Sequence, residues 1–109
     1  MTTVTLFSRE DRLVGFEVTG HTGLAPAGTD ILCAAVTSAV RLTECALNDI
    51  LGLEASVKVR EASVLLKLPA KLSPEQDAQC QTLLAAFLLH LTTLAEEHPQ
   101  HLLVLNLEV

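Results

Sequence analysis

The feature that most constrains the fold is the way short strand patterns alternate with two long helix patterns along the chain. Apolar and polar side chains alternate over Thr3–Phe7 and again over Leu13–Gly20, where Val14, Phe16 and Val18 share one face. The charged turn "REDR" separates these two segments, so they predict a β-hairpin.

Two more strand patterns and two helix patterns follow. The strands are expected at Ala55–Val59 and Ser63–Leu68, and the helices at about Asp30–Leu51 and about Ser73–Glu97. His101–Val109 closes the chain as a last strand, partly buried on both faces. The order ββαββαβ predicts an α/β fold of the α+β type: a two-layer sandwich with two helices on a largely antiparallel sheet.

Residues with known end preferences mark both helices. Thr29 or Asp30 is the expected N-cap of the first helix, and Gly52 follows its last turn. In the second helix Ser73 is the cap, Pro74 takes the first helical position and Gln76 stands three residues after the cap, as in a capping box.

Length and hydropathy indicate one soluble domain that associates with itself. At 109 residues, the chain is long enough for a single core, so we expect one domain over residues 1–109. Half of the residues are apolar, yet no apolar run reaches the ~20 residues of a membrane-spanning helix, so no membrane partner is expected. A two-layer domain of this size cannot bury so many apolar side chains, which favours a homo-oligomer.

The charge balance argues against direct nucleic-acid binding. Thirteen acidic residues against seven basic ones give a net charge of −6, and the lysines and arginines form no run. Affinity for a phosphate backbone comes from clustered cations, which this sequence lacks.

The cysteines and histidines match neither a disulfide framework nor a metal site. Cys33, Cys45 and Cys80 are an odd number of thiols at wide spacing, and Cys45 and Cys80 are interpreted as buried and inert. His98 and His101 have no third ligand near them in the sequence. We therefore expect no metal and no cofactor. With no signal peptide, the expected location is the cytoplasm.

Cys33 is the thiol whose position favours chemistry. The predicted helix has an apolar stripe, made of Leu32, Ala35, Ala39, Leu42, Ala46 and Ile50. Cys33 lies about 120° from the centre of that stripe. A structural cysteine more often points into the core, so a place on the flank favours an accessible thiol.

The surroundings of Cys33 suggest a nucleophile with a base. In the first turn of the expected helix, unpaired N–H groups and the helix dipole would stabilise a thiolate. His21 stands at the end of the second strand, across a glycine-containing loop, and could be its general base. Asp30 could cap the helix, orient the imidazole, or do both.

The segment "GHTG....G.DILCAAVTSAV" resembles the signature of the ribosomal-processing cysteine proteases, the bacterial Prp family. In that family a Gly-His-x-Gly loop leads through Gly-x-Asp into an Ile-(Val/Leu)-Cys-Ala-Ala-Val helix. The resemblance extends over nearly the whole chain in length and element order. It implies Cys33 as nucleophile, His21 as general base, Asp30 as a supporting residue, a homodimer and a cytosolic role.

The resemblance also implies a substrate, the N-terminal extension of large-subunit ribosomal protein number twenty-seven. The expected substrate loop contains Gly20, Gly23, Leu24 and Gly28. Because glycines adopt backbone conformations closed to other residues, we expect Gly20–Thr29 to be mobile and to close over a peptide. Leu24 stands where the family often has an aromatic residue, which affects cleavage-site preference more than chemistry.

Two other functions remain open at this point. A non-catalytic ribosome-associated or assembly module of the same fold would need no activated thiol. A thiol redox protein is less favoured because the sequence has no CxxC pair.

Overall fold

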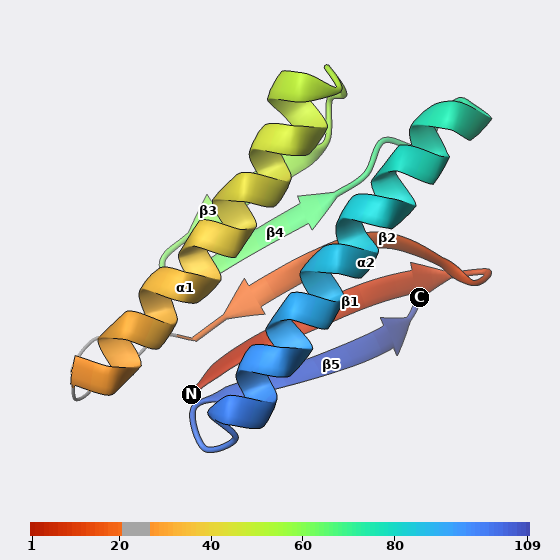
Figure 1. Ribbon diagram of the computed structural model, residues 1–109. Helices are drawn as coiled ribbons and strands as arrows, with labels where there is room; N and C mark the ends of the chain where they lie inside the picture. The colour runs from red at the N-terminus through yellow and green to blue at the C-terminus, as the bar shows by residue number, and fades with distance from the viewer. Residues whose placement is uncertain (21–26) are drawn as a thin grey trace.

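The computed structural model describes residues 1–20 and 27–109, without the side chains of residues 27–30. The elements run along the chain in the predicted order ββαββαβ (Figure 1). They are β1 (Thr2–Arg9), β2 (Arg12–Thr19), α1 (Ala27–Glu44) with its π-helical continuation η1 (Cys45–Ile50), β3 (Ser56–Arg60), β4 (Ser63–Lys67), α2 (Pro74–Glu97) and β5 (Leu102–Glu108).

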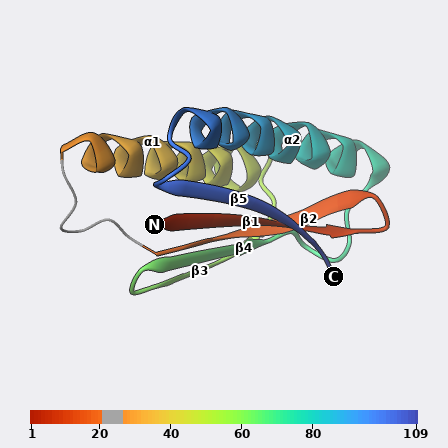
Figure 2. The same ribbon diagram turned by 90° about the horizontal axis from the view of Figure 1, so that it is seen from below.

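The five strands form one sheet in the order β3-β4-β2-β1-β5. Neighbouring strands are antiparallel except β1 and β5, which run parallel. Both helices lie on the same side of this sheet and leave its other face uncovered (Figure 2). The predicted two-layer sandwich with a largely antiparallel sheet is therefore confirmed.

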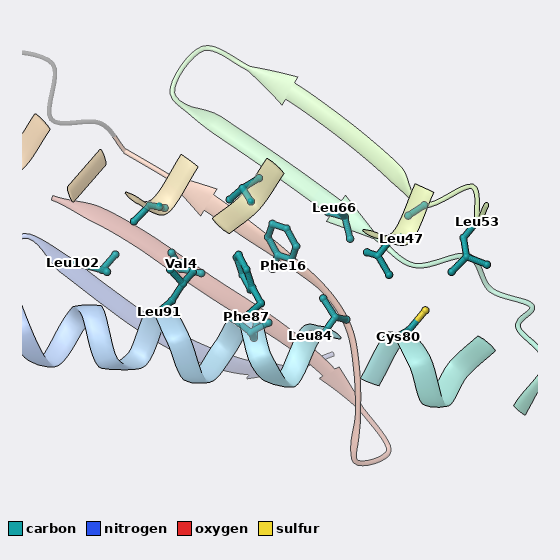
Figure 3. Close-up of a cluster of buried hydrophobic side chains, with 14 of the residues drawn as sticks. Val4, Phe16, Leu47, Leu53, Leu66, Cys80, Leu84, Phe87, Leu91 and Leu102 are labelled. Carbon is teal, nitrogen blue, oxygen red and sulfur yellow. The ribbon is translucent and has the colours of Figure 1, made fainter. Parts of the chain in front are cut away.

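The core lies between the sheet and the helices (Figure 3). The rings of Phe16 on β2 and Phe87 on α2 stack with centroids 4.3 Å apart. Leu66 of β4 and Leu84 of α2 are fully buried as well. These side chains come from neighbouring strands and from one face of α2, as the alternation in the sequence predicts.

The second helix begins as predicted. The Ser73 hydroxyl accepts a hydrogen bond from the Gln76 backbone N–H at 3.1 Å, and the Gln76 side chain accepts one from the Ser73 N–H at 2.9 Å. Pro74 occupies the first turn, where its missing N–H costs nothing.

The first helix departs from the prediction at its start and on its faces. It begins at Ala27, so neither Thr29 nor Asp30 is its N-cap. The buried stripe consists of Leu32, Val36, Val40, Thr43 and Leu47. Leu42 and Ile50, which the periodicity places in the core, are 71% and 76% exposed. The buried face includes the polar Thr43, whose hydroxyl donates to the Ala39 carbonyl, in place of the predicted Leu42.

The end of the first helix follows the prediction more closely. The π-helical turns of η1 end at Ile50, and Gly52 has a φ of 68°, the left-handed conformation typical of a residue that ends a helix.

A β-bulge in β2 changes which of its side chains share a face, so the predicted face is wrong in part. Phe7 pairs with Gly15 and Ser8 with Leu13, so Val14 is an extra residue between the paired positions. Leu13 packs against the core, whereas Val14 lines a cleft on the uncovered side of the sheet. Val14 and Phe16 therefore do not share a face.

Two helical stretches, Ile31–Ile50 and Pro74–Glu97, are long and apolar enough to cross a membrane by length and composition. Neither stretch is an uninterrupted apolar run of ~20 residues, since Arg41 and Glu44 interrupt the first and Gln81 and His90 the second, so the predicted absence of such a run holds. Mostly buried core helices of soluble proteins pass the same test, and in these two stretches 28% and 22% of the tested window is buried.

Gly20 fixes the point where the chain leaves β2. Its φ is 84°, and a Cβ added to it would lie 2.3 Å from the Met1 carbonyl oxygen. Its N–H donates to the Ala62 carbonyl at 3.0 Å. The chain end and the β3–β4 turn thus hold this residue from two sides.

We expect Gly20→Ala to lower the free energy of unfolding by about 2 kcal/mol or more, because the methyl group adds a backbone clash to the strain of a positive φ. Gly52→Ala is the matched control, since Gly52 has φ 68° and a Cβ added there would meet no atom within 4 Å. It should cost only about 1 kcal/mol. Denaturant unfolding of both variants measures the difference, and equal losses would show that the close approach to Met1 is unimportant.

Arg12 and Asp77 join the β1–β2 hairpin to the start of α2. The Arg12 Nε donates to both carboxylate oxygens at 3.1 Å, and this hydrogen bond lowers the pKa of Asp77. Next to the pair, the Gln81 side chain bonds the Leu13 backbone N–H and C=O, each at 2.8 Å. The side chains of Arg12 and Asp77 are 41% and 28% exposed, so the pair is worth about 0.2–1 kcal/mol.

This pair predicts a pH-dependent stability. The pKa of Asp77 is lower in the folded state than in the unfolded chain. The pair therefore contributes fully to the free energy of unfolding above the aspartate pKa of the unfolded chain, about 3.9. That contribution is lost as the pH falls through the folded pKa. Unfolding free energies should therefore differ between wild type and Asp77→Asn at pH 7 and converge in acid. Glu75→Gln is the control, an exposed change in the same turn, and its unfolding free energy should stay close to that of wild type at both pH values.

Candidate active site

Cys33 lies at the border between the buried and exposed faces of α1. Its neighbours Leu32 and Val36 are 3% exposed, whereas Ile31 and Ala34 are exposed to solvent. Since each helical residue advances by about 100°, Cys33 falls beside the buried row. Its side chain is partly buried and lies closer to the buried row than the predicted angle of about 120°, because that row is rotated from the predicted stripe.

The distance of Cys33 from the helix start differs from the prediction. Because α1 begins at Ala27, Cys33 follows six residues later and lies in the second turn. A helix leaves only its first four N–H groups unpaired, and the dipole effect fades within the first turn. The helix start alone therefore cannot stabilise a Cys33 thiolate in the way the sequence suggested.

The other predicted site residues divide into three groups. Gly20 is held in a fixed conformation at the end of β2. Gly28 is the second residue of α1 and so lies in a helix rather than in a loop, and Asp30 lies in the same first turn. His21, Gly23 and Leu24 lie outside the described residues, so the predicted mobile loop and its closure stay predictions.

Gly20 and the first turns of α1, which contain Gly28, Asp30 and Cys33, lie at one end of the sandwich. β2 ends at Thr19, which pairs with Thr3 at the start of β1, and His21 follows two residues after Thr19. The first turns of α1 lie at this same end of the sheet (Figure 1). Asp30 and Cys33 are three residues apart in α1, a spacing that puts two positions on one helix face.

Sequence reasoning missed the groups that hold Gly20. The Met1 carbonyl and the Ala62 carbonyl are backbone atoms from distant parts of the chain. Only the strand pairing of the folded sheet brings them to Gly20, and no local pattern reports it.

The other two cysteines, Cys45 and Cys80, differ in how deeply they are buried. Cys80 is fully buried between α2 and the sheet, and its burial raises the pKa of the thiol. Cys45 is only partly buried, so the prediction that both are buried is wrong for Cys45. Cys45 lies at the start of η1, three turns beyond Cys33 along the helix axis.

A cleft of about 490 Å³ opens on the uncovered face of the sheet. Phe7 and Leu65 line it, together with Arg9, Glu17 and Lys67. Arg9 is the last residue of β1, at the opposite end of the sheet from Gly20 and the start of α1. This cleft is therefore separate from Cys33. Within residues 1–20 and 27–109, no group of three or more His, Cys, Asp or Glu side chains could hold a metal ion.

Known proteins resemble this chain both in sequence and in fold. The ribosomal processing cysteine protease Prp of Bacillus subtilis is 28% identical over 99 residues, which cover 89% of this chain and 88% of that protein. The crystal structure of SMU.848 from Streptococcus mutans matches with a TM-score of 0.86 at 29% identity, over 100% of this chain and 96% of that one.

The essential ribosomal processing protease Prp of S. aureus has been solved with a substrate peptide and with a covalently linked product peptide. It matches with a TM-score of 0.82 at 16% identity, over 97% of this chain and 99% of that one, which shows a shared fold. The family model of the cysteine protease Prp matches residues 1–103. The chain therefore belongs to the Prp family of cysteine proteases.

Proposed function

We propose that this chain is the cysteine endopeptidase that removes the N-terminal extension of large-subunit ribosomal protein number twenty-seven, with Cys33 as nucleophile and His21 as general base. Family membership supports a cysteine protease. The observation that carries the assignment of Cys33 is its place on α1, partly accessible and at the end of the sheet from which the chain continues to His21.

The proposed reaction has two steps. His21 takes the thiol proton, and the Cys33 sulfur attacks the carbonyl carbon of the scissile peptide bond. The C–N bond breaks as His21 returns a proton to the leaving amine, which is the new N-terminus of the ribosomal protein. Water, deprotonated by the same imidazole, then hydrolyses the thioester and releases the extension.

The position of Cys33 makes the imidazole essential to this proposal. A thiol in the second turn of a helix gains little from the helix dipole, whose influence is confined to the first turn. The thiolate must then be generated by a neighbouring base. His21 is the histidine that the sequence places next to the fixed residue Gly20, so its backbone starts from a defined point.

Of the two roles that the sequence suggested for Asp30, only the orientation of the imidazole is compatible with the helix start. Asp30 cannot cap α1, because the helix begins three residues earlier. In the proposal Asp30 supports the site from the turn before Cys33, by orienting the imidazole. We further propose that the enzyme acts in the cytoplasm as a homodimer, which the exposed apolar side chains of the sheet and helices support.

The thiols should differ in reactivity. We expect iodoacetamide to modify Cys33 first at neutral pH in the folded protein and Cys80 last, because burial both hides Cys80 and raises the pKa of its thiol. Cys45 is the matched comparison, since it is partly buried like Cys33 but has no proposed base. Peptide mapping of the alkylated protein measures the three rates. Modification of Cys45 as fast as Cys33 would count against an activated nucleophile.

The enzyme assay tests the whole proposal. Wild type should shorten the extended ribosomal protein, Cys33→Ala should be inactive, and His21→Ala should lose about 10²–10⁴-fold in kcat/KM. Cys45→Ala and the exposed His90→Ala are matched controls that should keep wild-type activity. Mass spectrometry of the product follows cleavage. A wild-type protein that binds the extended substrate without cutting it would instead indicate a non-catalytic assembly module.

A further inference from the structure

The charges of this chain are distributed unevenly between its two layers. The five strands carry five of the seven lysines and arginines but only two of the thirteen acidic residues, Glu17 and Glu108. The helices and connecting segments therefore hold most of the negative charge. The sheet is a basic layer in an acidic protein, and the helices leave one of its faces uncovered (Figure 2).

Strand pairing gathers Lys58, Arg60 and Lys67 on that uncovered face. Leu66 of β4 is buried on the helix side, so the alternate residues of β4, among them Lys67, point the other way. Lys58 and Arg60 of β3 pair with those alternate residues, and directly opposite residues of an antiparallel pair share a face. Cations that form no run in the sequence thus follow one another at one edge of the sheet, with their backbones about 7 Å apart.

The cleft on the same face combines an aromatic ring with positive charge. Phe7 of β1 is half-buried and lines the cleft. Gly15 of β2 pairs with both Phe7 and Lys67, so no side chain stands between the ring and that ammonium group. Arg9 also lines the cleft. We call Arg9, Lys58, Arg60 and Lys67 the outer-face cations.

The outer-face cations are available to an anion from outside the chain. Within residues 1–20 and 27–109, the one ion pair joins Arg12 to Asp77, so the charge of Arg12 in the cleft wall is already matched. Glu17 is the one strand carboxylate on the uncovered face, because Glu108 alternates with it to the helix side. Positive charge is therefore in excess on this face, although the whole chain has a net charge of −6.

We propose that the uncovered face of the sheet binds single-stranded RNA, with one base stacked on Phe7 in the cleft and neighbouring phosphates on the outer-face cations. Proteins that bind single strands combine aromatic rings, on which any base can stack, with cations along the backbone path. An open sheet face with exposed aromatic residues is an established platform for this kind of binding. The cleft and the cation row supply both parts side by side.

Other anionic partners match only part of this face. An acidic peptide or an anionic lipid surface would satisfy the cations but has no base to stack on Phe7. The bases of a double helix are stacked on one another and cannot reach the ring. The choice of RNA over DNA rests on the proposed function, since the proposed substrate is a component of the ribosome.

The test measures binding of a labelled single-stranded RNA of about 12 nucleotides by fluorescence anisotropy. Between about 50 and 200 mM salt, the logarithm of the association constant should fall against that of the salt concentration with a slope of about −2 to −3, for three or four neutralised phosphates. Lys58→Gln should make this slope shallower by about 0.7. Phe7→Leu should weaken binding by about 5- to 150-fold and leave the slope unchanged.

Two further variants separate a specific face from general attraction. Glu17→Gln removes the strand carboxylate of the face and should tighten binding by about two- to five-fold. Arg41→Gln is the matched control for Lys58→Gln, because it removes the same charge from an exposed position on α1 and should leave the affinity unchanged. Thermal unfolding checks that each variant is folded.

Several outcomes would overturn the proposal. They are no RNA binding by wild type at low salt, equal losses in Lys58→Gln and Arg41→Gln, and a folded Phe7→Leu variant that binds like wild type. Tighter binding to single-stranded DNA of the same sequence, or to phosphatidylglycerol vesicles, would do the same and assign the face to that partner. Cleavage of the free extended ribosomal protein should be unchanged in Lys58→Gln, since Cys33 lies in the other layer. The RNA proposal and the peptidase proposal therefore fail separately.

Discussion

The stacking of Phe16 on Phe87 is the contact on which the arrangement of the molecule depends. Phe16 stands on β2, between β4 and β1 in the sheet, and Phe87 is midway along α2. Burial of such side chains stabilises a fold by about 1.5–3 kcal/mol each. The contact holds α2 over the sheet (Figure 3), and α1 lies beside α2 on the same face (Figure 2).

The position of β2 then determines the site. Its far end reaches Gly20, where the Met1 carbonyl leaves room for a glycine and for no other residue without strain, and the Ala62 carbonyl accepts the Gly20 N–H. From that fixed point the chain continues to His21 and returns as α1, which carries Cys33. The proposed mechanism assigns the general base to the segment after β2 and the nucleophile to α1.

Local patterns in the sequence predicted the parts of the fold that local interactions determine. The capping box at Ser73, the end of the first helix at Gly52 and the element order all follow from neighbouring residues. The bulge at Val14 and the exposure of Leu42 depend on strand register and on how far α1 rotates against the sheet. Those quantities are set by distant contacts, so alternation and helical periodicity could not give them.

The position of Cys33 was also only partly predictable from the sequence. The sequence predicted an accessible thiol at Cys33, whereas its side chain is partly buried because the apolar face of α1 is rotated toward it. Its turn along the helix was not predictable, because Asp30 is a good capping residue and no local feature marks Ala27 as the earlier start. In the proposed mechanism, activation of the Cys33 thiol therefore depends on the imidazole rather than on the helix dipole.

The most direct test of Cys33 as the nucleophile is residual cleavage of the extended ribosomal protein as a function of the fraction of Cys33 that iodoacetamide has modified. Peptide mapping of each sample gives the modified fraction at every cysteine. The account predicts that activity falls in proportion to Cys33 modification and reaches zero when that thiol is fully alkylated. Activity that persists with Cys33 fully alkylated, or that declines with modification of Cys45 instead, would contradict it.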